Sequence, residues 1–219
     1  MKTFAILLLA GNSTRFVSSK KKQFFILKDK PVFLYSLETF ENSKYIDEII
    51  VVANESDLDD VKQEISRFKK VKHLVQGGQV RQESVKNGLD AINEDGYVLI
   101  HDAARPLVDE EIISSLVESL KDYEGVTPAI KVVDTIVKGK DGIISSFEDR
   151  DSLYRIQTPQ AFRVKIIKLA HQKFADKNAS DDTTLLYMLG KKVKIVEGKE
   201  KYKKITKLED IDSLKEFIK

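Results

Sequence analysis

Short apolar runs alternate with amphipathic segments along the first part of the chain, and this alternation constrains the fold more than any other feature. Runs typical of buried strands cover residues 3–10, 48–53, 72–76, 97–101 and 125–130. Between them, apolar residues recur at the three- and four-residue spacing of helices. Continuous runs such as IIVVA are typical of strands covered on both faces. The sequence therefore predicts an α/β fold with a mostly parallel, doubly wound sheet.

The alternation ends after residue 130, where KVVDTIVKGKDGIISSF predicts two β segments around Gly139 to Gly142. Further helices are expected at 164–174, 181–189 and 208–218, and one further strand at 192–196. A two-stranded ribbon is marginally stable alone, so we expect it to project as a β-arm at about 132–158 and to pack on a partner subunit. No repeat or linker divides the chain, and we predict one domain over residues 1–219.

Composition excludes several kinds of chemistry. The 219 residues contain no cysteine, which rules out disulfides, thiolate metal sites and a cysteine nucleophile. The three histidines lie far apart and lack metal-ligand spacing. A net charge of +2 gives no reason to expect a nucleic-acid partner. No apolar run is long enough to span a membrane, and the first is short for a secretory signal, so we predict a cytoplasmic protein.

Small and polar residues gather where the predicted strands end. In open α/β sheets, ligands bind beyond the carboxyl ends of the strands. The segments found there, or near the end of the chain, are AGNSTR, QGGQVRQES, HDAARP, RIQTPQ and KYKKIT. They offer glycine, hydroxyl and cationic side chains and one well-placed aspartate, but no nucleophile–base pair. A site for a phosphorylated ligand is the functional interpretation of this pattern.

The segment from Gly11 to Lys22 belongs to a long connection. About twenty residues separate the first strand from the helix expected near Pro31, and loops longer than ~12–15 residues are uncommon unless they are functional or disordered. Backbone amides near Gly11, with Arg15 and Lys22, are able to hold a polyphosphate. On this pattern alone, a solvated lysine-rich loop explains the segment better.

Two other strand ends also have a structural and a functional interpretation. In the structural interpretation, the glycines at 77–78 simply make a tight turn. In the functional interpretation, they allow a base or ribose to approach closely, with Ser84 as a hydrogen-bond partner. In the structural interpretation, Asp102 caps a helix or forms an ion pair with Arg105. In the functional interpretation, it binds an Mg²⁺ ion that bridges phosphates. His101 is expected to be a packed, hydrogen-bonded residue rather than a catalyst.

Taken in order, these motifs resemble the 2-C-methyl-D-erythritol 4-phosphate cytidylyltransferases. The matching segments span nearly the whole chain and are LAGNSTRF, KKQFF, GGQVRQESV, VLIHDAARP, VVDTIV, QTPQAF, SDDTTL, VKIVEG and KKIT. The resemblance implies a Rossmann-like nucleotidyltransferase domain whose β-arm exchanges across a homodimer. It also implies CTP and a polyol phosphate as substrates, the CDP-linked methylerythritol and pyrophosphate as products, and Mg²⁺ or another divalent cation as cofactor.

The resemblance assigns roles at the matching positions. The catalytic pair is Arg15 and Lys22. The nucleotide-binding positions are Ala10, Gly11, Gly78, Ser84 and Ala103, and the metal position is Asp102. The positions for the polyol phosphate are Thr135, Arg150, Thr158, Lys204 and Arg105, the first two reaching in from the partner's arm. Because the attacking phosphate oxygen is already ionised at neutral pH, such a site needs no general base.

The chain departs from the family's pattern at a few positions. Ser13 replaces a second glycine, Lys21 replaces a proline, Gln79 replaces an acidic residue, and Tyr202-Lys203 displace an asparagine. We expect these changes to reduce or alter CTP affinity. Two alternatives stay open: a ribitol-5-phosphate cytidylyltransferase, which shares the fold and the nucleotide chemistry, and a non-catalytic nucleotide-binding homologue.

Overall fold

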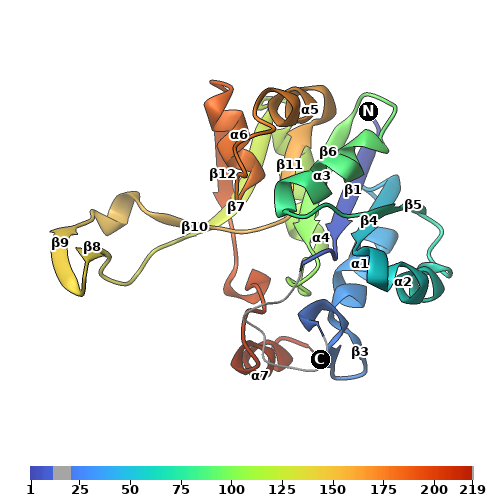
Figure 1. Cartoon of the computed structure of the whole chain (residues 1–219), viewed down its shortest axis with the longest axis horizontal. Coiled ribbons are helices and arrows are strands. Elements are labelled where there is room, and N and C mark those ends of the chain that lie inside the picture. Colours follow the sequence, from blue (N-terminus) through green and yellow to red (C-terminus); the bar gives the residue numbers. More distant parts are fainter. Residues whose placement is uncertain (12–20, 219) are drawn as a thin grey trace.

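The computed structural model describes residues 1–11 and 21–218, and its centre is an eight-stranded sheet (Figure 1). The strands are β1 (Thr3–Leu8), β4 (Glu48–Ala53), β5 (Val71–Gln76), β6 (Tyr97–Asp102), β7 (Gly125–Lys131), β10 (Tyr154–Ile156), β11 (Gln160–Arg163) and β12 (Val193–Glu197). They follow the order β10-β7-β11-β6-β1-β4-β5, and β12 also pairs with β7. Among these described strands, only β10 and β11 run antiparallel to their neighbours. The predicted α/β fold with a mostly parallel sheet is confirmed.

Helices cover both faces of this sheet. They are α1 (Val32–Asn42), α2 (Leu58–Ile65), α3 (Arg81–Asp90), α4 (Glu110–Ser119), α5 (Val164–Lys173) and α6 (Asp182–Met188). The helix α7 (Glu209–Lys215) packs apart from the sheet faces. Ala5 and Leu7 of β1 lie in one apolar cluster with α1, α2 and α4, whereas Phe4 and Ile6 lie in another with α3, α5 and α6. Successive side chains of a strand point to opposite faces, so the continuous apolar runs are explained by burial on both sides.

The sequence missed several short elements. After the first loop come the 3₁₀ helix η1 (Lys22–Phe24) and a small hairpin of β2 (Ile26–Leu27) and β3 (Lys30–Pro31), where we expected an irregular connection. Strands β10 and β11 were missed as well. Elements of two to four residues carry no readable periodicity, which is why the pattern did not reveal them.

The predicted hairpin is present as β8 (Val137–Lys140) and β9 (Ile143–Phe147), a separate two-stranded sheet that projects from the main one (Figure 1). Asp141 and Gly142 form its turn with φ of 52° and 79°, the positive values that a two-residue hairpin turn requires. Because β10 belongs to the main sheet, the part of the chain outside it spans 132–153 rather than 132–158.

A third, smaller apolar cluster joins distant parts of the chain. Leu27 of β2 and Val32 of α1 pack there with Ile205 and with Ile211 and Leu214 of α7, which lies at the lower end of the molecule in Figure 1. The predicted division into a single domain stays a prediction. No helix in residues 1–11 or 21–218 is both long and apolar enough to cross a membrane.

Candidate functional site

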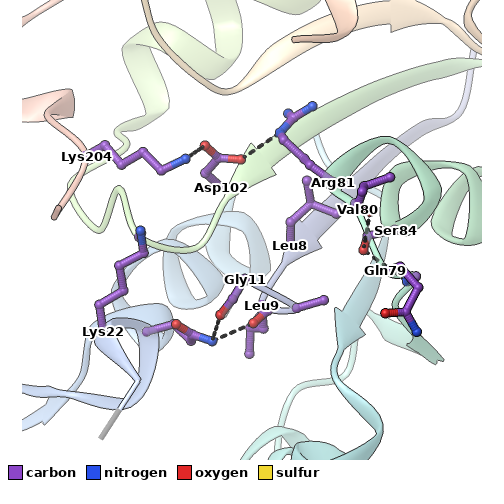
Figure 2. Close-up of a pocket in the computed structure, with 14 residues that line it drawn as sticks. Leu8, Leu9, Gly11, Lys22, Gln79, Val80, Arg81, Ser84, Asp102 and Lys204 are labelled. Atoms are coloured by element: carbon purple, nitrogen blue, oxygen red, sulfur yellow. Dashed lines mark hydrogen bonds and ion pairs between the residues drawn. The ribbon is translucent and has the colours of Figure 1, made fainter. Parts of the chain in front are cut away.

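A polar pocket lies beyond the carboxyl ends of β1 and β6, where α/β sheets bind ligands (Figure 2). Seven of the predicted site residues line it: Ala10, Gly11, Lys22, Gly78, Ser84, Asp102 and Lys204. Lys22 and Lys204 lie on one side of the view, and Ser84 and Gln79 on the other. The pocket thus has a cationic side and a side formed by the loop that precedes α3.

Asp102 ends β6 and is shared by two cations. Its Oδ2 lies 2.6 Å from Lys204 Nζ, and its Oδ1 lies 3.3 Å from Arg81 Nε. Burial alone would raise the pKa of Asp102, but the charges of Arg81 and Lys204 outweigh burial and hold the pKa well below its ordinary value of 3.8. The carboxylate is therefore ionised at neutral pH and available to cations.

Side-chain contacts of its two neighbours, Lys21 and Gln23, hold the segment that carries Lys22. Buried Gln23 donates from Nε2 to the carbonyl of Leu9 at 2.6 Å and to that of Gly11 at 3.1 Å. Lys21 pairs with Asp57 at 2.6 Å, and its φ of −61° is one that a proline also adopts. Lys21 therefore has a φ compatible with the proline expected at this position, and its side chain is anchored to Asp57.

The two glycines before α3 allow a close approach. Neither has a positive φ, but a Cβ on Gly77 would lie 2.4 Å from Ala10 Cβ, and one on Gly78 would lie 2.3 Å from Glu83 Cβ. The amide of Gly78 donates to Ser84 Oγ at 3.1 Å. Both sequence interpretations hold in part, because the glycines make a turn and also let the loop pack tightly beside the end of β1.

Three predicted residues lie beside the pocket lining rather than in it. Arg105 is largely buried and donates from Nη1 to the carbonyl of Tyr202 at 2.8 Å, which ties the segment before Lys204 to the sheet. Thr158 Oγ1 accepts from the amide of Asp102 at 3.2 Å, and the amide of Ala103 donates to the carbonyl of Leu8 at 3.1 Å. These residues hold the backbone that presents the lining.

The predicted residues of the arm are separate from the pocket of their own chain. Thr135 and Arg150 are exposed, and Arg150 Nη1 donates to the carbonyl of Val133 at 3.2 Å within the arm. Neither lines the pocket. Arg15 and Ser13 fall outside the described residues.

Sequence reasoning assigned no role to Arg81, although it lines the pocket and contacts Asp102. Its Nη1 also lies 2.7 Å from Oδ2 of Asp182, the first residue of α6. The two residues belong to the motifs QVRQES and SDDTTL. These motifs were the only signal in the sequence, because nothing in the local pattern indicates that the two segments meet.

His101 is a packed histidine, as expected. It is fully buried, donates from Nε2 to the carbonyl of Arg105 at 2.9 Å, and contacts Thr158 Oγ1 through Nδ1 at 3.0 Å. A carbonyl can only accept, so Nε2 carries a proton, and the ring is neutral at pH 7 because its pKa is lowered. Burial lowers its pKa from 6.5 to about 4.

Acidification is expected to destabilise the protein through His101. The unfolded chain takes up the proton near pH 6.5 and the folded chain only near pH 4, so the free energy of unfolding should fall by about 2 kcal/mol between pH 7 and 4.5. Urea unfolding at the two pH values measures this. His101→Gln should flatten the dependence, and His73→Gln, at an exposed position of β5, should not. If the free energy of unfolding fell equally with pH in the parent and both variants, His101 would not be the residue responsible.

Comparisons with known proteins identify the family. Residues 3–219 match the family model of 2-C-methyl-D-erythritol 4-phosphate cytidylyltransferase. The enzyme of that name from Clostridium acetobutylicum is 40% identical over 222 residues, covering 98% of this chain and 96% of the relative. The crystal structure of 4-diphosphocytidyl-2C-methyl-D-erythritol synthase from Anaerococcus prevotii is 29% identical with a TM-score of 0.88, covering 99% and 96% of the two chains. The bifunctional IspDF from Campylobacter jejuni is 32% identical with a TM-score of 0.84, covering 98% of this chain and 54% of that one.

Fold, pocket and matches together define an α/β cytidylyltransferase. The chain belongs to the 2-C-methyl-D-erythritol 4-phosphate cytidylyltransferase family, whose reaction joins CTP and this polyol phosphate in the non-mevalonate pathway. The family is the one that the sequence motifs resemble, rather than either of the two alternatives left open there.

Proposed function

We propose that the pocket beyond β1 and β6 is where this chain carries out cytidylyl transfer. The observation that carries the proposal is that Arg81 and Lys204 both pair with one carboxylate, Asp102, in a pocket that a third cation, Lys22, also lines. A triphosphate and a phosphate monoester are both polyanions, and they need such cations to approach each other.

In the proposed reaction, a phosphate oxygen of methylerythritol phosphate attacks the α-phosphorus of CTP. The new bond joins that oxygen to the α-phosphorus, and the bond from the α-phosphorus to the bridging oxygen of the β-phosphate breaks, so pyrophosphate leaves with the electron pair. No proton has to move, because the attacking group is already ionised. Lys22, together with Arg15 outside the described residues, offsets the charge that grows on the α-phosphoryl oxygens, and Lys204 faces the phosphates.

The loop before α3 is proposed to receive the nucleoside. Ser84 lies across the pocket from the lysines, and it accepts a hydrogen bond of 3.1 Å from the amide of Gly78, which fixes the loop before a ligand arrives. Ala10 and Gly11 provide the floor at the end of β1. Ala103, Thr158 and Arg105 hold the backbone beside this lining. A loop held in this way loses little freedom on binding, which favours affinity.

Asp102 suits a divalent metal. Mg²⁺ prefers one or two carboxylates together with phosphate oxygens and water, and Asp102 is an ionised carboxylate whose two oxygens already accept from cations. In residues 1–11 and 21–218 no group of three or more metal-ligating side chains occurs, so the nucleotide would supply much of the coordination. Bound there, the metal would neutralise phosphate charge.

We infer that the arm completes the site of a second copy of this chain. Thr135 and Arg150 lie outside the pocket of their own chain, and Ile143 and Phe147 on the arm are 72% and 71% exposed. Large apolar side chains on a projecting ribbon are typical of a surface that another subunit covers. A homodimer with exchanged arms brings Thr135 and Arg150 to the polyol phosphate.

Mixing two inactive variants should restore activity if the arms exchange. Lys22→Ala damages the pocket and Arg150→Ala damages the arm, so a dimer of one subunit of each kind has one site in which both parts are intact. Random subunit exchange should return about one quarter of the parent's activity. Each variant mixed with itself is the control. No recovery after proven exchange would mean that pocket and arm act within one chain.

The activity itself is tested by pyrophosphate release from CTP and Mg²⁺, with methylerythritol 4-phosphate and with ribitol 5-phosphate as acceptors. Release with the first alone is expected. Release with ribitol phosphate alone would overturn the acceptor, and silence with both, in a protein that binds CTP, would favour the non-catalytic alternative.

A further inference from the structure

Asp182 is a buried carboxylate that the proposed mechanism does not use. Its side chain is 1% exposed, and each of its oxygens has a partner. Oδ1 lies 3.0 Å from His171 Nε2, and Oδ2 lies 2.7 Å from Arg81 Nη1. His171 belongs to α5, so two neighbouring helices fix where this carboxylate points. The residue comes from the SDDTTL segment, to which no role has been assigned.

Arg81 joins Asp182 to the pocket. One guanidinium is shared between two carboxylates, but unequally, because it lies 2.7 Å from Asp182 and 3.3 Å from Asp102. The shorter contact is with the residue outside the pocket lining. Asp102 is therefore left with a long contact to Arg81 on Oδ1 and a short one to Lys204 on Oδ2 (Figure 2).

The charges along this chain of contacts alternate. Asp182, Arg81, Asp102 and Lys204 carry two negative and two positive charges in sequence, and the group is neutral as a whole. Without the charge of Asp182, the guanidinium of Arg81 would keep its contact with Asp102 and lose the competing one. Attraction between Arg81 and Asp102 would then strengthen, because opposite charges in a partly buried place interact strongly.

We propose that Asp182 is a positioning residue that holds Arg81 back, so that Asp102 keeps an oxygen available for a metal–nucleotide complex. The inference rests on the proposed function, since it takes the pocket to bind CTP with a divalent cation. It assigns Asp182 an effect on one step only, metal-assisted nucleotide binding. If the ion pair between Asp182 and Arg81 were purely structural, its loss would lower stability, or it would weaken CTP binding equally with and without Mg²⁺.

Calorimetric titration of the full-length protein with CTP, in Mg²⁺ and in EDTA, separates these possibilities. In the parent protein Mg²⁺ should tighten CTP binding. Asp182→Asn should weaken binding in Mg²⁺ by about tenfold and leave binding in EDTA within about twofold, because only the metal competes with Arg81 for Asp102. Equal affinity for parent and variant in Mg²⁺, or equal losses in both titrations, would overturn the inference.

Asp181→Asn is the matched control. It removes the same charge one residue earlier, and Asp181 caps α6 by accepting from the amide of Thr183 at 2.9 Å, so its loss also costs stability. Its side chain accepts hydrogen bonds from Thr183 and Gln160, and the partner of Arg81 is its neighbour Asp182. The affinity of this variant for CTP in Mg²⁺ should stay within about twofold of the parent's. A tenfold loss here would show that general charge, and not the contact with Arg81, is responsible.

A second comparison keeps the test valid if Asp182→Asn folds poorly. In an Arg81→Gln background the guanidinium is gone, so adding Asp182→Asn should change CTP affinity in Mg²⁺ by less than about twofold. Removing both partners also avoids leaving one buried charge alone. A tenfold further loss in this background would overturn the inference. If the parent protein does not bind CTP, the proposed function is overturned as well. If the parent binds CTP and Asp182→Asn binds it equally well, this inference alone is overturned.

Discussion

Replacing Lys22 by alanine should lower kcat by about a thousandfold and leave the fold intact. The lysine lines the cationic side of the pocket and begins a short 3₁₀ helix whose backbone Gln23 holds to the end of β1. Removing one group that stabilises developing charge typically costs two to three orders of magnitude in kcat. Steady-state pyrophosphate release at saturating CTP and methylerythritol phosphate is the measurement.

Two companion variants make the Lys22 result specific. Lys86→Ala removes an equal charge on α3, where the lysine pairs with Asp90 at the surface, and should leave kcat unchanged. Lys22→Arg keeps the charge and should recover part of the activity. A loss of less than about tenfold in Lys22→Ala would remove this lysine from the proposed transition-state contacts.

Replacing Asp102 by asparagine should abolish Mg²⁺-dependent turnover and lower the free energy of unfolding by about 3 kcal/mol at pH 7. The variant keeps the shape of the side chain but leaves Arg81 and Lys204 without the charge they share. Activity is followed by pyrophosphate release and stability by urea unfolding. Asp47→Asn removes a carboxylate that accepts from the amide of Thr3, at the opposite end of β1, and should retain turnover.

The stability effect of Asp102 should depend on pH in one direction. Its folded pKa is lower than its unfolded value of 3.8, so the carboxylate stabilises the fold above that value and the contribution fades as pH falls through the folded pKa. The difference in unfolding free energy between parent and Asp102→Asn should therefore be complete at pH 7 and smaller at pH 3. A difference that is unchanged at pH 3 would contradict the role given to the charge.

Local patterns in the sequence were sufficient for the sheet and for part of the site. Apolar runs predict strands that are buried on both faces, and the ends of parallel strands meet at one edge, so Gly11 and Asp102 were expected to lie together. His101 followed from its position within such a run. These inferences require only the pattern within each segment and one rule about where segments end.

Contacts between distant segments were beyond the reach of such patterns. Arg81 and Asp182 are 101 positions apart, and Lys21 and Asp57 are 36 apart. No periodicity relates such pairs, and their pairing depends on which helices the folded sheet brings together. Lys21 illustrates this, because nothing in the neighbouring sequence indicates that Asp57 lies beside it. The motifs QVRQES and SDDTTL marked the right residues without indicating that they touch.

The small apolar cluster of Leu27, Val32, Ile205, Ile211 and Leu214 bears on how the enzyme matures during synthesis. The parallel strands β1, β4, β5 and β6 all leave the ribosome before residue 103, and they pair with one another without any later segment between them. Part of the packing around Leu27 and Val32, however, forms only when residues 205–214 emerge, and Lys204 arrives at the same time. A nascent chain thus pairs these four strands early, whereas the proposed nucleotide pocket stays incomplete until Lys204, 102 residues after Asp102, has been added.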